Sequence, residues 1–125
     1  MLDHLGLEVA DFERSRAFYE QALAPLGISL LMEPAAQVAG FGEAHDQKPY
    51  FWIGTRSGTP STGVHVAFEV PSRELVDAFH AAALEAGGTD NGAPGVREIY
   101  HPTYYGAYVF DPDGNNVEAV CHRPA

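Results

Sequence analysis

A histidine stands at the head of two similar segments of this chain, HLGLEV at residues 4–9 and HVAFEV at residues 65–70. Glu118 follows the turn sequence DPDG near the end. Two neutral imidazoles and one carboxylate can bind a divalent ion such as Fe(II), Mn(II), Ni(II) or Zn(II) and leave positions open for water and substrate. A strand histidine is often only structural, and Glu118 could be an exposed glutamate on a terminal strand. The repetition of His4 and His65 at equivalent positions favours the metal-binding interpretation.

The repeat extends beyond these histidines and predicts a duplicated module. At the same offset, the dipeptide Ala17-Phe18 matches Ala78-Phe79, so a strand and the helix after it occur twice. We therefore expect an α+β fold made of two βαβββ modules in one domain. The modules are expected at about residues 1–57 and 63–122 of a single domain over 1–125.

The periodicity of apolar residues predicts the elements of each module. In the first half we expect a helix over 12–26 and strands over 3–9, 28–33, 37–43 and 49–55. In the second half we expect a helix that begins after an N-cap at Ser72, and strands over 64–70, 96–100, 104–111 and 115–121. The glycine-rich segments at 56–63 and 87–95 are expected to be a linker between the halves and a loop.

Side chains alternate across a strand, so each predicted strand has two distinct faces. In the first strand Leu5 and Leu7 share an apolar face, whereas His4 and Glu8 share the opposite face. The strand that begins at His65 has the same pattern. We expect the apolar faces to pack on the helices and the histidine faces to line a cavity.

The final predicted hairpin gives the most specific geometry. DPDG has proline where a type I turn favours it and glycine where the next residue becomes left-handed. This turn places Tyr108 opposite Glu118, with Cβ atoms about 4.5–5.5 Å apart. Val117 and Ala119 form the apolar face of the last strand, so Glu118 is expected to share the cavity with Tyr108. Tyr108 could be a catalytic hydrogen-bond donor or general acid, or it could simply support Glu118.

Three further residues are candidates for substrate binding. Trp52 and Tyr50 alternate with core-facing residues, so they could form an aromatic wall of the cavity or pack within the protein. His101 lies between two predicted strands at the expected rim of the cavity. It could contact substrate there, or be an exposed turn residue.

Composition narrows the class of function. The net charge of −10 argues against nucleic acid as a partner, because nucleic acid binding needs basic patches. No apolar run is long enough to span a bilayer, and the first residues lack the pattern of a signal peptide. Cys121 is the only cysteine, which suits a reducing compartment. We therefore expect a cytoplasmic protein that binds a small molecule, with no membrane or nucleic acid partner.

The chain resembles the vicinal oxygen chelate (VOC) superfamily, which includes glyoxalases, bleomycin resistance proteins and extradiol dioxygenases. The resemblance covers nearly the whole chain and rests on DHLGLEVADFERSRAFYEQAL, GVHVAFEVPSRELVDAFHAAALEAGG and YVFDPDGNNVEAV. It implies paired βαβββ modules forming a cupped, barrel-like mixed sheet around a divalent metal, with helices outside. It also implies His4, His65 and Glu118 as ligands, and a homodimer whose site could lie within one chain or across two.

Trp52 is a departure from the pattern of glyoxalase I-type members. Those proteins have a fourth ligand, usually glutamate, at this position, and the loss of that glutamate argues against lactoylglutathione chemistry. Three-ligand sites resemble those of extradiol dioxygenases and fosfomycin-modifying transferases. Extradiol enzymes use a further catalytic histidine that has no match here, and Gly6 stands where the fosfomycin enzymes have threonine.

The resemblance implies a metal-dependent enzyme, a glyoxalase-related lyase or a dioxygenase, whose substrate the sequence does not assign. Its metal would chelate vicinal oxygens of the substrate and stabilise an enolate or oxyanion. The alternative is a metal-free protein, similar to bleomycin resistance proteins, that sequesters a cationic drug. Trp52 and the acidic charge suit that alternative, but it has no use for two histidines and Glu118. A catalytically dead scaffold is a third interpretation.

Overall fold

The computed structural model describes residues 1–125 and consists of two βαβββ modules, as the duplicated sequence predicts. The first module contains β1 (Leu5–Glu8), α1 (Phe12–Leu23), the short 3-10 helix η1 (Ala24–Leu26), β2 (Ile28–Ala35), β3 (Val38–Glu43) and β4 (Phe51–Gly54). The second contains β5 (His65–Glu69), α2 (Arg73–Glu85), β6 (Thr89–Val96), β7 (Tyr105–Phe110) and β8 (Asn116–Cys121). Neither α1 nor α2 combines the length and apolar character that crossing a membrane requires.

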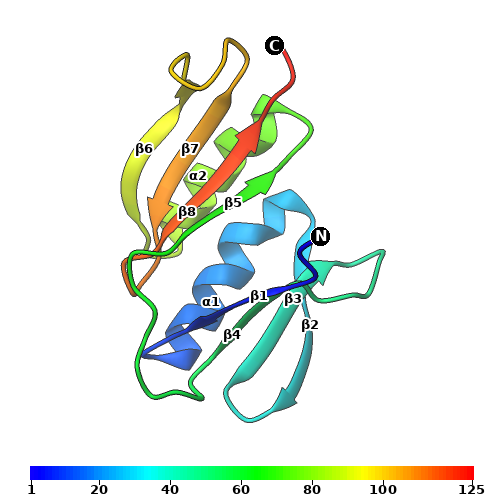
Figure 1. The fold of residues 1–125 in the computed structure, drawn as a ribbon, viewed down its shortest axis with the longest axis vertical. Helices are drawn as coiled ribbons and strands as arrows, with labels where there is room; N and C mark the ends of the chain where they lie inside the picture. The colour runs from blue at the N-terminus through cyan, green and yellow to red at the C-terminus, as the bar shows by residue number, and fades with distance from the viewer.

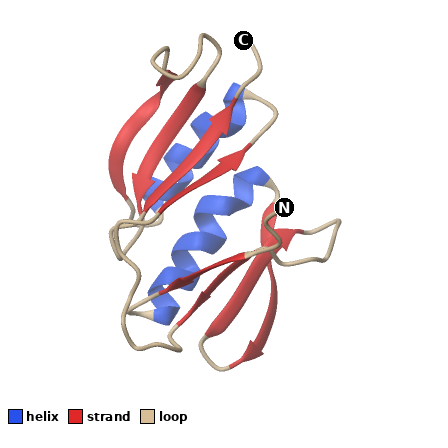
Figure 2. Cartoon of the chain, viewed as in Figure 1, coloured by secondary structure: helices blue, strands red, loops and turns tan.

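The two modules form two separate four-stranded sheets with the same topology. The strand orders are β1-β4-β3-β2 and β5-β8-β7-β6. In each sheet the first and last strands of the module pair in parallel, and the remaining pairs are antiparallel. The second module occupies the upper half of Figure 1 and the first module the lower half, and the sheets curve without closing into a barrel (Figures 1 and 2). This arrangement confirms the expected α+β fold and leaves β1 and β5 at sheet edges.

The core lies between the helices and the apolar faces of the strands. Residues at helical spacing on both helices are fully buried, among them Phe18 and Tyr19 on α1 and Phe79 on α2. The two helices also contact each other. The rings of Phe51 and Phe68, one from each sheet, lie 5.6 Å apart and join the modules into one core. The opposite faces of the sheets are therefore free to carry function.

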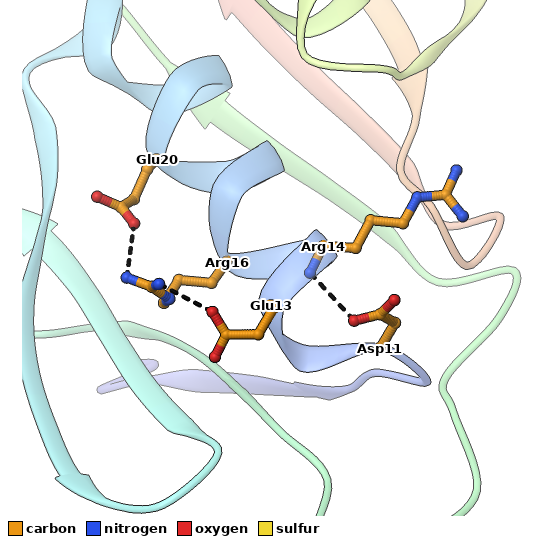
Figure 3. Close-up of polar contacts among 5 residues, drawn as sticks. All are labelled: Asp11, Glu13, Arg14, Arg16 and Glu20. Atoms are coloured by element: carbon orange, nitrogen blue, oxygen red, sulfur yellow. Dashed lines mark hydrogen bonds and ion pairs between the residues drawn. The ribbon is translucent and has the colours of Figure 1, made fainter.

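Local sequence explains where the first helix begins and how its exposed face is stabilised. The Asp11 carboxylate accepts a hydrogen bond from the backbone N–H of Arg14, which caps the helix (Figure 3). Arg16 forms ion pairs with Glu13 at 3.0 Å and with Glu20 at 3.2 Å, one turn away in each direction (Figure 3). The second helix begins after its predicted cap, Ser72.

The prediction of a loop at 87–95 is wrong, because most of this segment is strand β6. The turn lies after it, where a strand over 96–100 was expected. β6 is an edge strand with irregular register, and the irregularities fall at Gly92 and Gly95. A Cβ at Gly92 would lie 2.8 Å from the Tyr108 ring, so glycine there reflects close packing rather than a loop. Pro94 is tolerated because only one side of an edge strand is paired.

The DPDG hairpin turn has the predicted geometry and is anchored to the core. Asp111 and Asn115 close the turn with a backbone hydrogen bond of 2.9 Å, and Gly114 is left-handed with φ of 87°. The buried Asp111 carboxylate accepts the hydroxyl of Tyr19 at 2.5 Å. The turn that sets the register of β7 and β8 is thereby fixed to α1.

Candidate functional site

His65 and Glu118 meet on the face of the second sheet that points away from the helices. β5 and β8 run in parallel with Ala67 paired to Glu118, so His65 at the start of β5 is close to the glutamate. His65 Nε2 lies 2.9 Å from Glu118 Oε1. The Glu118 side chain is fully buried, whereas that of His65 is 53% exposed. The pair therefore combines a desolvated carboxylate with an imidazole that is open to the surroundings.

Two tyrosines surround the same carboxylate. Tyr108 is paired with Glu118 across β7 and β8, which confirms the register predicted from the turn. The Tyr104 hydroxyl donates a hydrogen bond to Glu118 Oε2. A Cβ at Gly106 would lie 3.0 Å from Glu118 Oε2 and 3.2 Å from the Tyr104 ring. Glycine at this position gives the carboxylate and the tyrosine room to meet.

Both phenols keep their protons at neutral pH. Burial, followed by the hydrogen bond to Glu118, raises the pKa of Tyr104 well above its ordinary value. Burial also raises the pKa of Tyr108, and the charge of Glu118 adds to the effect. A protonated phenol is a hydrogen-bond donor, so Tyr104 holds the carboxylate, while Tyr108 is available to donate to an oxygen in the cavity.

His4 lies in the first module, away from the His65–Glu118 pair. Its Nδ1 atom is 2.7 Å from Asp3 Oδ1, and its side chain is 61% exposed. It lines a cavity of about 400 Å³ on the first sheet, together with Trp52. No group of three or more His, Cys, Asp or Glu side chains in the chain is arranged to hold a metal ion. One chain therefore brings together two of the three predicted ligands and places the third elsewhere.

Trp52 occupies the position equivalent to Glu118. Gly6 pairs with Trp52 in the first sheet as Ala67 pairs with Glu118 in the second. On the other side, Gly40 faces Trp52 where Tyr108 faces Glu118. A Cβ at Gly40 would lie 2.8 Å from the Trp52 ring, so the indole lies over this glycine. The first sheet thus has an aromatic surface at the position where the second has a carboxylate.

Tyr50 lies beside the core. It packs against the buried cluster and lines a smaller groove of about 220 Å³, which residues 2–5 and β5 also border. Burial raises its pKa. This groove lies between the modules, and neither His65 nor Glu118 lines it.

His101 lies near the Glu118 site and forms a cluster that the sequence alone did not indicate. His101 Nε2 is 2.8 Å from His122 Nδ1, and the backbone N–H of Thr103 donates to His101 Nδ1. The Tyr104 ring packs against both imidazoles. Neither Tyr104 nor His122 is among the residues predicted from the sequence. Tyr104 could have been found by alternation, because it lies four residues before Tyr108 and so shares its face.

The donor set of the pair fits a divalent transition metal in part. A neutral imidazole nitrogen and a carboxylate oxygen are ligands that such ions accept. The buried carboxylate of Glu118 forms no ion pair with lysine or arginine, so a bound cation would compensate a desolvated charge. His65 and Glu118 can supply two ligands, and further ligands have to come from outside this cluster.

Comparison with known proteins gives a consistent result. The model of the Glyoxalase/Bleomycin resistance protein/Dioxygenase superfamily matches residues 1–119. A crystal structure of a glyoxalase/bleomycin resistance protein from Albidiferax ferrireducens T118 is 34% identical, with a TM-score of 0.81, and the match covers 98% of each chain. The comparison with curated proteins gave no match.

Two more distant structures share the fold. One is a glyoxalase/bleomycin resistance protein/dioxygenase family enzyme from Burkholderia phytofirmans PsJN, at 21% identity, TM-score 0.72 and 98% coverage of both chains. The other is a lactoylglutathione lyase from Agrobacterium tumefaciens, at 15% identity and TM-score 0.70, covering 97% of this chain and 92% of that one.

Proposed function

The chain belongs to the glyoxalase/bleomycin resistance protein/dioxygenase superfamily, and we propose that it is a metal-dependent enzyme acting on a small molecule as a lyase or dioxygenase. The observation that carries this proposal is the contact of 2.9 Å between His65 Nε2 and the fully buried Glu118 carboxylate. The proposal includes the cytoplasmic location expected from the sequence.

The residues around the pair have distinct roles in this proposal. Glu118 and His65 would hold the metal, and Tyr104 keeps the carboxylate oriented. A divalent metal bound there would supply Lewis-acid chemistry, which stabilises an enolate or oxyanion formed on vicinal oxygens of a substrate. Tyr108 keeps its proton and can donate it, or a hydrogen bond, to a substrate oxygen. Trp52 would form an apolar wall for the rest of the substrate.

A homodimer would complete the site. Each chain has one half with His4 and Trp52 and another half with His65 and Glu118, and the chain does not bring His4 together with the other two ligands. His4 directly precedes β1 and His65 begins β5, and both strands lie at sheet edges, where backbone groups can pair with another chain. We therefore propose that His4 of the partner subunit is the third ligand of each His65–Glu118 pair.

Metal analysis of protein purified without chelators tests the enzyme proposal. The wild type is expected to retain a divalent metal, and His4→Ala, His65→Ala and Glu118→Gln are expected to lose it. His45→Ala is the matched control, because His45 is a highly exposed histidine whose only ion pair is with Glu43. If His4→Ala and His65→Ala bind as much metal as the wild type, the proposal fails.

Mixing two inactive variants tests whether the site spans a dimer. In a mixed dimer of His4→Ala and His65→Ala chains, one site carries both substitutions and the other carries neither. Random mixing should therefore restore about a quarter of the wild-type metal content, because half of the dimers are mixed and each has one intact site. A site formed within one chain would regain nothing on mixing.

A second function is favoured by the cavity on the first sheet. Its volume of about 400 Å³ and its Trp52 surface suit an aromatic ligand, and the chain is strongly acidic. A metal-free protein that sequesters a cationic drug, like bleomycin resistance proteins, would use this surface. Such a protein would bind bleomycin with quenching of Trp52 fluorescence, and both histidine variants would bind it as well as the wild type.

A further inference from the structure

Arg97 lies on the same face of the second sheet as the His65–Glu118 pair. Its backbone N–H donates to the Tyr104 carbonyl at 2.7 Å, which continues the pairing of β6 with β7. Residues directly opposite in antiparallel strands share a face, so Arg97 shares that of Tyr104. Its guanidinium carbon lies 5.3 Å from the centre of the Tyr108 ring, and that ring lies 6.2 Å from the His65 ring. The Tyr108 ring thus lies next to both the guanidinium and the imidazole of the pair.

Two glycines of β6 make room for this side chain. A Cβ at Gly95 would lie 2.9 Å from Arg97 Nη1, and a Cβ at Gly92 would lie 3.4 Å from Nη2. The guanidinium therefore lies close against the backbone of the bulged edge strand. The glycines that made this segment resemble a loop lie at the bulges of β6, and these bulges direct Arg97 toward Tyr108.

The guanidinium of Arg97 has no anionic partner within the chain. Its one hydrogen bond to the protein goes from Nη2 to the carbonyl oxygen of Ala93, although a guanidinium has five N–H donors. The chain has 17 acidic and 7 basic side chains, so carboxylates are abundant. Two of the seven basic side chains form ion pairs with them, Arg16 with Glu13 and Glu20 (Figure 3) and Lys48 with Asp3. Arg97 forms no such pair.

We propose that Arg97 recognises an anionic group of the substrate, either a carboxylate or a phosphonate-type oxyanion. A guanidinium binds both through two parallel hydrogen bonds, and its stacking on Tyr108 holds it in place for such an anion. This proposal rests on the proposed function in one respect, which is that the reacting end of the substrate would face His65 and Glu118. It defines the substrate as a small anion whose charged group lies about one aromatic ring from the reacting oxygens.

Titration of the metal-free protein, followed by NMR, tests this proposal separately from metal binding. The probes are benzoate, phenylphosphonate and the neutral analogue benzamide, none of which has the vicinal oxygens that a metal would chelate. We expect one or both anions to shift the amide signals of β6 and β7, and benzamide to leave them unchanged. The tighter of the two anions identifies the carboxylate or the phosphonate class.

Variants then assign the binding to Arg97. Arg97→Gln should weaken anion binding by about ten- to hundredfold, the worth of a charge-assisted hydrogen bond. Arg97→Lys keeps the positive charge but cannot form two parallel hydrogen bonds, so it should weaken anion binding by an intermediate amount. Arg14→Gln is the matched control, since Arg14 is exposed and its guanidinium makes no contact with the other residues drawn in Figure 3. The NMR spectrum of each variant shows whether it is folded.

Three results would overturn the proposal. The first is binding to Arg97→Gln as tight as to the wild type, and the second is an equal loss in Arg14→Gln, which would indicate net charge alone. The third is no difference between the anions and benzamide, including no binding of any of them. Because the protein is free of metal, failure here leaves the metal analysis unaffected, and failure of the metal analysis leaves this result standing.

Discussion

Replacing Tyr104 with phenylalanine removes one hydroxyl from the buried carboxylate and leaves the aromatic ring in place. Glu118 has no exposed surface, so water cannot replace the lost donor without rearrangement. A hydrogen bond to a charged group contributes about 1.5–3 kcal/mol. We expect the free energy of unfolding of the metal-free protein to fall by about 2 kcal/mol, which corresponds to about 6–8 °C in Tm.

The neighbouring tyrosine provides a matched control for this substitution. The Tyr105 hydroxyl donates to Asp77 at 2.7 Å, but this hydrogen bond is exposed to water. Tyr105→Phe removes the same atoms and should cost about 1 kcal/mol or less. Denaturant unfolding of both variants and the wild type gives the comparison. In the metal-binding assay, Tyr104→Phe should lose about ten- to hundredfold in affinity, as is typical when a ligand loses its orienting partner.

Equal behaviour of the two variants would contradict the orienting role of Tyr104. If Tyr104→Phe is no less stable than Tyr105→Phe and binds metal as tightly as the wild type, Tyr104 does not hold Glu118. Lower stability with unchanged metal affinity would show that the hydrogen bond supports the fold alone. The orienting role assigned to Tyr104 would then be withdrawn.

Two further predictions concern the glycine beneath Trp52 and the buried Tyr19. Gly40→Ala should displace the indole, shift the emission of this only tryptophan and cost about 1–3 kcal/mol, whereas Gly6→Ala, with 3.9 Å to the nearest atom, should leave the emission unchanged. Burial, and next the charge of Asp111, raise the pKa of Tyr19 well above its ordinary value of 10.0. The protonated phenol therefore stabilises the fold fully below pH 10, and this stabilisation is lost as the pH rises further. Above that pH the unfolding free energy of the wild type should fall relative to Tyr19→Phe by about 1.4 kcal/mol per pH unit, and parallel pH profiles of the two proteins would contradict this.

Alternation and turn chemistry account for what the sequence predicted well. Both are local, so the module plan, the buried faces and the Tyr108–Glu118 register follow from short stretches of chain. β6 was missed because glycines usually indicate a loop. Here Gly92 and Gly95 instead leave room for the side chains of Tyr108 and Arg97, a contact that the local sequence does not reveal. The relation of His4 to His65 was out of reach for a related reason. Their equivalence within the repeat fixes each strand face but says nothing about how the two sheets are placed.

The two sheets share strand order and register, so equivalent positions show how the modules have diverged. Trp52 and Glu118 correspond, and so do their neighbours Gly40 and Tyr108. The differences come in matched pairs, because the indole needs the space that glycine leaves, whereas the carboxylate gains a hydroxyl beside it. The first module therefore offers an aromatic surface with His4, and the second a polar one. A cavity formed by one face of each kind would suit a substrate with a polar, oxygen-bearing end and an apolar remainder.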